Sequence, residues 1–192
     1  MEDLIKALKS RNMNGYFVKS SREAKLKALE LIPKNAVVGF GGSATLQQIG
    51  ILEELRGRKD IKLLDRTRVK LEELPELFSK IFSADIFLSG TNAITKKGQL
   101  VNVDGIGNRV AAITYGPKKV IIIIGKNKIT KDSDSALERI KKVSLVKNIE
   151  RMKETGRTDW SMENMWGQVS IIERQRIPDR IHVIIVDEEL GF

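Results

Sequence analysis

The sequence contains no cysteine and a single histidine, His182, among its 192 residues. The absence of cysteine excludes disulfide bonds, iron–sulfur clusters, thiolate zinc sites and cysteine nucleophiles. One histidine leaves too little for a Ser-His-Asp triad or a multi-histidine metal site. We therefore expect no metal site and no iron–sulfur cluster, and the residues point to no other cofactor. His182 lies within an apolar segment that predicts a buried strand, so we expect it to have a structural role.

The chain also lacks a long apolar segment. No apolar run approaches the ~18 residues that a membrane span needs. Residues 1–10 have an acidic residue, Asp3, and a helical rhythm, rather than the apolar core of a signal peptide. We therefore expect a cytoplasmic protein without a membrane span.

Positive charge is unevenly distributed along the chain. The formal net charge is +9, and residues 118–157 hold twelve Lys or Arg against five Asp or Glu, a net charge of +7. This pattern suggests one charged face, which is either a solvated helix surface or a docking face for an acidic partner. Nucleic-acid binding is a third alternative. The segment contains no aromatic residue, so it has no platform for stacking single-stranded bases.

Short apolar segments alternate with segments of helical periodicity. The run 120–124 consists of five β-branched residues, which is typical of a central strand buried on both faces. The alternation predicts an α/β fold with a mostly parallel sheet flanked by helices. The expected strands span residues 15–18, 36–39, 61–64, 86–89, 99–103, 120–124 and 181–186. The expected helices span residues 1–10, 21–31, 46–55, 74–82 and 132–151.

The length fits a single domain over residues 1–192. We expect an α/β core with an N-terminal helix over 1–155, an irregular C-terminal arm over 156–180 and a final strand within 181–192. The segment 99–103 is expected to pair beside 86–89. The arm carries both tryptophans, Trp160 and Trp166, for which we favour packing over a role as a lid on a ligand.

Ligands of α/β proteins bind beyond the carboxyl ends of the strands, and three loops at such positions are rich in glycine and small polar residues. The first loop spans 39–45, where free backbone N–H groups at a helix start attract anions. It is neither a G-x-G-x-x-G nor a Walker A motif. The alternative is a tight turn in which Ser43 caps the following helix. The candidate ligand-binding residues of this loop are Gly41, Gly42, Ser43 and Thr45.

The other two loops span 90–95 and 104–109. Arg109 is the best single anion-binding candidate, because a guanidinium group holds a carboxylate or phosphate through two parallel hydrogen bonds. The alternative for Arg109 is an internal salt bridge with Asp104. Lys128 follows the central strand and is expected to reach the same crevice, unless it is an exposed lysine. The candidates of this group are Gly90, Thr91, Asn92, Asp104, Gly105, Asn108, Arg109 and Lys128. No pair of carboxylates suited to general acid–base catalysis is visible.

With these loops considered together, the sequence resembles the lactate-utilization (LUD) domain family, which includes the LutC type. The matching stretches are VGFGGSATLQQIG (38–50), the segment from LSGTNAITKKGQLVNVDGIGN to GKNKI (88–129) and RIHVIIVDEELGF (180–192). The resemblance implies the fold of the ribose-phosphate isomerase and coenzyme A-transferase superfamily. It also implies an association with L-lactate oxidation, beside iron–sulfur and FAD-type oxidoreductase subunits.

Two departures from the family pattern limit what the resemblance implies. Many members carry a cysteine cluster in the region that here spans 158–173, which contains none. Sugar-phosphate isomerases of the superfamily have an acidic residue where this chain has Asn92, and an amide cannot act as a general base. The setting of a coenzyme A-transferase glutamate is also missing. Neither isomerase nor transferase activity is therefore implied, and whether the chain is an enzyme stays open.

The leading expectation is a LUD-type protein that binds a small anionic metabolite or nucleotide-like ligand in the glycine-rich crevice. The alternative is a subunit without chemistry of its own that docks on a redox partner. The oligomeric state is open, with a homo-oligomer as one alternative.

Overall fold

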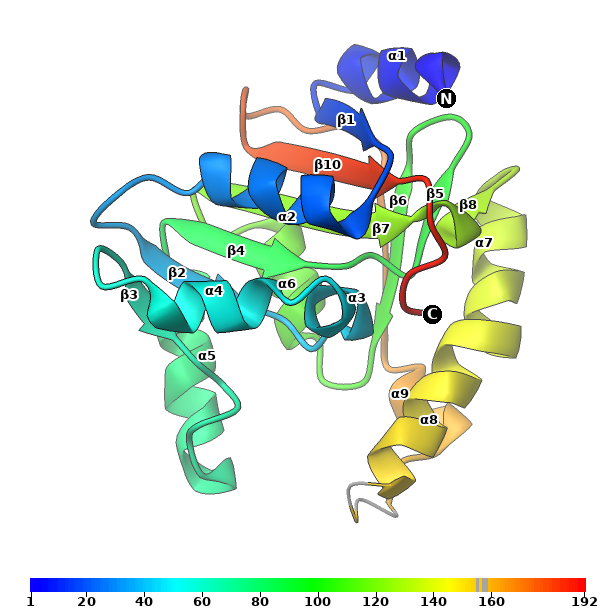
Figure 1. The fold of residues 1–192 in the computed structure, drawn as a ribbon. Coiled ribbons are helices and arrows are strands. Elements are labelled where there is room, and N and C mark those ends of the chain that lie inside the picture. Colours follow the sequence, from blue (N-terminus) through cyan, green and yellow to red (C-terminus); the bar gives the residue numbers. More distant parts are fainter. Residues whose placement is uncertain (155, 157–158) are drawn as a thin grey trace.

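A parallel six-stranded sheet forms the centre of the molecule (Figure 1). The computed structural model describes residues 1–154, 156 and 159–192. All neighbouring strands of this sheet run parallel, which confirms the predicted fold class. In spatial order, the strands are β1 (Asn14–Val18), β10 (Ile181–Val186), β7 (Lys119–Gly125), β4 (Ile86–Ser89), β2 (Val37–Phe40) and β3 (Lys62–Leu64).

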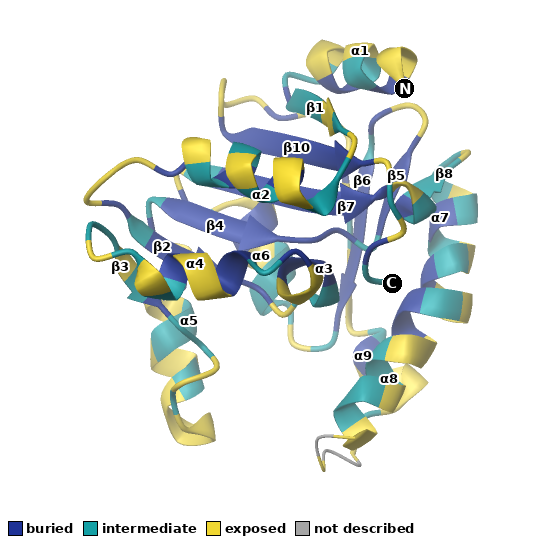
Figure 2. Ribbon diagram, in the orientation of Figure 1, coloured by how far each residue is buried: buried dark blue, intermediate teal, exposed yellow. Residues whose placement is uncertain are grey.

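Helices cover both faces of this sheet because its central strands are apolar on both faces. Ile121 and Ile123 of β7 pack into one core cluster, whereas Val120, Ile122 and Ile124 pack into another on the opposite face. Figure 2 shows β4, β7 and β10 as buried. The first face is covered by α2 (Ser21–Glu30), α3 (Ala44–Gln48) and α4 (Ile51–Gly57). The second is covered by α1 (Glu2–Ser10), α5 (Leu74–Phe82), which follows a short 3₁₀ turn η1 (Leu71–Glu73), and α6 (Asn108–Thr114).

A second, four-stranded sheet corrects one expectation. Strand β6 (Leu100–Asp104) does not pair beside β4, because β2 and β7 already occupy both edges of β4. It folds back on β5 (Ala93–Thr95) as an antiparallel hairpin, whose turn contains Gly98 at a φ of +81°. The hairpin is joined by β8 (Ile129–Thr130) on one side and by β9 (Gln168–Ile172) on the other.

The C-terminal arm is more regular than its sequence suggested. It contains a short helix, α9 (Met162–Met165), and the edge strand β9. Val169 and Ile171 of β9 are exposed, so the strand lacks the continuous burial that marks the central strands. Trp160 and Trp166 pack against the core between the second sheet and the helices beside it, as expected.

Two of the expected helices are interrupted. Residues 46–55 divide into α3 and α4 at Gly50, which has a left-handed φ of +65°. The long helix consists of α7 (Ser133–Arg139), a π-helical turn (Ile140–Ser144) and α8 (Leu145–Glu154), and its inner side covers the second sheet. No helix within the described residues combines the length and apolar character that crossing a bilayer requires.

Candidate functional site

The carboxyl ends of β2, β4 and β7 bring parts of the predicted loops together. Gly41, after β2, donates its N–H to the carbonyl of Leu88 in β4 at 2.9 Å. The point where a Cβ would sit on Gly90, after β4, lies 3.0 Å from Ser43 Oγ and 3.6 Å from Lys128 Nζ. Lys128 belongs to a 3₁₀ turn, η2 (Lys126–Lys128), that directly follows β7. Ser43, Gly90 and Lys128 therefore lie together where the sequence predicted a ligand crevice, and the missing side chain of Gly90 permits this close approach.

Lys128 is buried without a counter-ion. Its side chain is buried, with 4% of the residue exposed, and Nζ donates to Thr45 Oγ1 at 3.2 Å. Among the described residues, no carboxylate lies within ion-pair distance of this ammonium group. Burial, followed by the positive charges of Arg139 and Arg109, lowers the pKa of Lys128 to about 7. The amine therefore changes charge near neutral pH and has no anionic partner within the described residues.

Arg139, on α7, is a second cation of the crevice, which the sequence reasoning missed. Its Nε donates to the carbonyl of Asn127 at 3.0 Å, and its Nη1 donates to the carbonyl of Asn92 at 2.8 Å and to Ser144 Oγ at 2.9 Å. Burial lowers the pKa of Arg139. In the described part of the chain it has no carboxylate partner either. One signal was present: Arg139 follows the inward-facing Ala136 by three residues, which places it on the same helix face.

Arg109 is held by the protein itself. Its Nε and Nη2 both contact Asp104 Oδ1, at 2.9 and 2.7 Å, so the alternative of an internal salt bridge describes it in this structure. Nη1 donates to Asn102 Oδ1 at 2.6 Å and Nη2 donates to Asn92 Oδ1 at 2.7 Å. Further contacts to the carbonyls of Gly90 and Val103 complete the five donors of the guanidinium group. Arg109 thus organises the second and third loops.

The remaining polar residues of these loops are also tied into the fold. Asn92 Oδ1 accepts from the N–H of Val103 at 2.9 Å, and Asp104 Oδ2 accepts from the N–H of Val110 at 2.7 Å. Thr91 Oγ1 donates to Asn102 Oδ1 at 3.0 Å. The amide nitrogen of Asn102 is buried and has no acceptor among the described residues. This nitrogen is therefore the one side-chain donor of the network for which no partner is found in the described part of the chain.

Other predicted site residues have local structural roles. Ser43 Oγ accepts from the N–H of Leu46 at 3.3 Å and caps α3, as the turn alternative for this loop requires. Helix α3 has only five residues, so its dipole contributes little to anion binding. Gly42 is exposed, Gly105 packs against Asn164 and Met165 of α9, and Asn108 begins α6.

The C-terminal segment covers the crevice, and sequence reasoning did not anticipate this. A Cβ on Gly191 would clash with Thr45 Oγ1 and lie 3.1 Å from Lys128 Nζ. Gly191 has a left-handed φ of +60°, which favours glycine. In Figure 1, this red segment runs from β10 towards α3 and α7.

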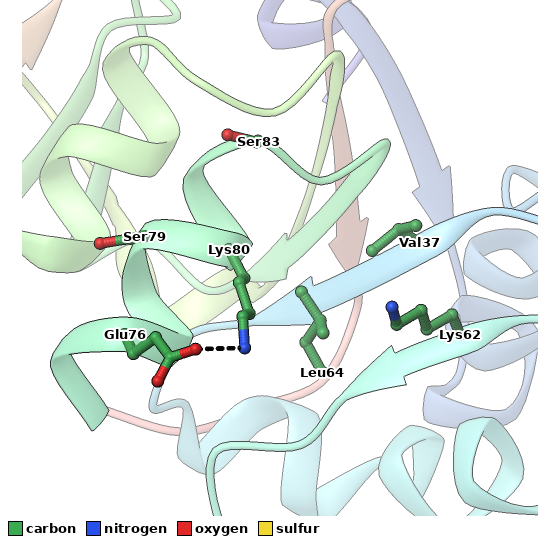
Figure 3. Close-up of a pocket in the computed structure, with 7 residues that line it drawn as sticks. All are labelled: Val37, Lys62, Leu64, Glu76, Ser79, Lys80 and Ser83. Atoms are coloured by element: carbon green, nitrogen blue, oxygen red, sulfur yellow. Dashed lines mark ion pairs between the residues drawn. The ribbon is translucent and has the colours of Figure 1, made fainter. Parts of the chain in front are cut away.

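A separate cavity of about 440 Å³ lies at the opposite end of the main sheet, beside the edge strand β3. Figure 3 shows its lining, in which Lys80 pairs with Glu76 at 2.6 Å. Val37 and Lys62 are the first residues of β2 and β3, so the cavity adjoins the amino ends of these strands. It includes none of the predicted site residues, and its size alone does not make it the functional site.

The structure divides the basic segment 118–157, which corrects the expectation of one continuous face. Lys118 pairs with Asp85 at 2.8 Å near the start of β7, whereas Lys142 pairs with Glu138 at 2.6 Å beside α7. Lys128 is buried in the crevice between them. The charges near the start of β7 and the charges that follow its end are therefore separated in space by the length of this strand.

A comparison with protein families identifies the chain. The family model described as LUD domain matches residues 1–186. The chain belongs to the LUD domain family. This LUD domain is similar in fold to a crystal structure of a DUF162 family protein from Deinococcus radiodurans. The two share 13% identity with a TM-score of 0.56, and the match covers 96% of this chain and 94% of that one.

Two further solved structures are less similar to this LUD domain. One is a D-ribose-5-phosphate isomerase in complex with phospho-erythronic acid, with 16% identity, a TM-score of 0.38 and coverage of 71% of this chain and 66% of that one. The other is eIF2B beta from Chaetomium thermophilum, with 15% identity, a TM-score of 0.37 and coverage of 70% and 47%. No curated protein matches the chain.

Proposed function

We propose that this LUD domain binds a small anionic metabolite, or the anionic group of a nucleotide-like ligand, in the crevice beyond β2, β4 and β7. The observation that carries the proposal is the buried ammonium group of Lys128, which has no carboxylate partner among the described residues. An unpaired buried charge is costly, and a bound anion would supply the missing counter-charge. The association of the family with lactate utilization makes lactate a natural first compound to test.

The surrounding groups fit an anionic ligand because they are mainly hydrogen-bond donors or cations. Arg139 adds a second positive charge without a carboxylate partner in the described chain. Arg109 contributes by holding Asn92, Asn102 and Asp104 in place, because its own donors are already satisfied. The role of Arg109 in this proposal is therefore positioning.

A comparison of two lysine variants tests the proposal. Thermal shift and calorimetry with lactate, phosphate, sugar phosphates, nucleotides and coenzyme A would be measured on Lys128→Met and Lys131→Met. Both substitutions remove one positive charge, but Lys131 is exposed on the surface. Any compound bound by the parent should lose at least tenfold in affinity with Lys128→Met and be unaffected by Lys131→Met, since a charge-assisted hydrogen bond is worth about 1.5–3 kcal/mol. Equal affinities in both variants would place the ligand elsewhere.

The second candidate function is docking on an iron–sulfur or FAD-type oxidoreductase subunit in the cytoplasm. It is favoured by Lys147 and Lys153 on α8, for which no ion pair is found among the described residues. The charge reversals Lys147→Glu and Lys153→Glu should abolish a salt-sensitive interaction with such a subunit. A filter-binding assay at low salt separates this function from nucleic-acid binding.

A further inference from the structure

The C-terminal segment Leu190–Phe192 is anchored over the crevice by side chains from the η2 turn and from helix α3. Asn127, in η2, accepts from the N–H of Leu190 at 3.1 Å and donates to the carbonyl of Gly191 at 3.3 Å. Gln48, at the end of α3, accepts from the N–H of Gly191 at 2.6 Å. Leu190 is buried in the core beneath α3 and α4.

Gly191 occupies the space that an anion would need beside Lys128. The position of its Cβ would lie 3.1 Å from Lys128 Nζ, so no ligand atom fits between the backbone and the amine. The hydroxyl of Thr45, which accepts from Lys128, is also turned towards this segment and contacts the carbonyl of Leu190 at 3.4 Å. The segment therefore contacts Lys128 and Thr45, the same groups that we propose bind the anionic ligand.

The anchors are of a kind that breaks reversibly. Gln48 is exposed, and the contacts that Asn127 and Thr45 make with the segment at 3.3 and 3.4 Å are long for hydrogen bonds. Phe192, beyond them, lies over the guanidinium group of Arg151 at 5.4 Å. Each neutral hydrogen bond of this type changes an equilibrium constant by about two- to tenfold, and the buried side chain of Leu190 also stabilises the docked state.

We infer that Leu190–Phe192 is an internal lid that occupies the anion subsite and must leave before a ligand reaches Lys128. This inference rests on the proposed function of the same crevice. It leads to an unusual expectation, because weakening the lid should strengthen ligand binding. A ligand that competes with a docked segment binds with an apparent affinity reduced by the fraction of molecules in which the segment is open.

The decisive variant is Gly191→Ala. Its methyl group would clash with Thr45 and strain a left-handed backbone, so the segment cannot dock as before. The matched control is Gly50→Ala, which introduces the same left-handed strain at a φ of +65° with no atom within 4 Å of the new Cβ. Calorimetry with inorganic phosphate and sulfate should show affinity about two- to tenfold tighter for Gly191→Ala. Affinity in Gly50→Ala should equal that of the parent.

A second pair of variants guards against misfolding of Gly191→Ala. Gln48→Ala removes one anchor, whereas Gln47→Ala removes the neighbouring exposed side chain of the same helix, for which no hydrogen bond to the lid is found among the described residues. Only Gln48→Ala should tighten binding. In the parent, phosphate should also accelerate hydrogen–deuterium exchange of the Leu190 and Gly191 amides, because both lose their acceptors when the lid leaves.

The possible outcomes of these experiments distinguish the proposed lid from the proposed anion site. If the anions bind the parent, Gly191→Ala and Gln48→Ala equally well, and exchange at Leu190 and Gly191 does not change, the lid is wrong while the anion site stands. If Gly191→Ala and Gln48→Ala bind more weakly than the parent, Leu190–Phe192 is part of the binding surface and the lid is again wrong. If no anion binds the parent or either lid variant, the proposed function fails, and the lid fails with it.

Discussion

The ammonium group of Lys128 lies 3.2 Å from the hydroxyl of Thr45, and this hydroxyl is the only protein acceptor found for it among the described residues. A buried lysine of this kind is costly to the fold unless it gives up its proton or receives an anion. Two other buried polar clusters, around Arg109 and His182, also affect the stability of the fold.

Removing Lys128 should stabilise the protein near neutral pH. The pKa of this amine is lowered from 10.5 to about 7, so between pH 7 and pH 10 the unfolded chain binds a proton that the folded chain does not. Stability then rises with pH across this window. Lys128→Met does not have this pH-dependent cost of burying an amine. At pH 7 its free energy of unfolding should exceed that of the parent by a few kcal/mol, on the order of the free energy that corresponds to the pKa shift.

Urea unfolding at pH 7 and pH 9.5 measures this difference in stability, which should be smaller at the higher pH. A parallel pH dependence in both proteins would contradict the prediction, and Lys131→Met is the control.

Anion binding should strengthen as the pH falls through neutrality. Lys128 gains its proton below its pKa of about 7 and then adds a positive charge to the site. Sulfate is a suitable probe, because its own charge does not change between pH 6 and pH 9. Its affinity should rise severalfold from pH 8.5 to pH 6 in the parent. Lys128→Met should show a weak and flat profile, and a profile in this variant as steep as in the parent would assign the proton to another group.

Breaking the pair between Arg109 and Asp104 should strongly destabilise the fold. Both side chains are largely buried, with 12% and 9% exposed, and Arg109 also satisfies Asn92 and Asn102. Arg109→Ala leaves the buried carboxylate of Asp104 without its counter-ion and removes one donor each from the amide oxygens of Asn92 and Asn102, at a cost of about 3–5 kcal/mol. Lys142→Ala, which breaks the exposed pair with Glu138, should cost less than about 1 kcal/mol. Chemical unfolding compares them, and similar small losses would show that Arg109 is not needed to hold the loops.

The double variant Arg109→Met with Asp104→Asn provides an internal check. Its loss of stability should be smaller than the two single losses added together, because the partners act as one unit. Additive losses would mean that the two groups are not energetically coupled.

Acid should weaken the junction between β1 and β10 at His182. This residue is buried, with Nε2 3.0 Å from the carbonyl of Asp179 and Nδ1 3.0 Å from the hydroxyl of Tyr16. The carbonyl can only accept, so Nε2 carries the proton and Nδ1 accepts from Tyr16. Burial lowers the pKa of His182 below 6.5, so stability present above pH 6.5 is lost as the unfolded chain takes up a proton at lower pH. Unfolding between pH 7.5 and pH 5 should show this loss in the parent and a flatter profile in His182→Gln. Equal slopes would contradict the assignment.

Local patterns in the sequence determined much of the main sheet. Five β-branched residues at 120–124 predicted a strand buried on both faces, and β7 has that environment. A strand that is buried on both faces has apolar residues at consecutive positions, so a short stretch of sequence is enough to predict it. The family and the strand-end position of the loops were also evident from the sequence.

The second sheet and the division of the 46–55 helix were decided by tertiary structure. Strand β6 had a correct predicted position but a wrong predicted neighbour, because pairing depends on which sheet edges other strands have already occupied. Strand β9 escaped prediction because it lies at an edge, where Val169 and Ile171 remain exposed. A short stretch of sequence shows neither which strands are neighbours in a sheet nor which strand lies at its edge.

Some features of the crevice could also be predicted from the sequence, whereas others depend on the folded chain. The absence of cysteine chemistry and the positions of Lys128 and the glycine-rich loops near strand ends could be predicted from the residues alone. Three further features became visible only in the folded chain: Arg109 donates its hydrogen bonds to the protein, Arg139 lies close enough to Lys128 to lower its pKa, and Gly191 covers both Thr45 and Lys128. The type of a residue fixes which bonds its side chain can make. The partners it finds are brought within reach by chain segments that lie far apart in sequence.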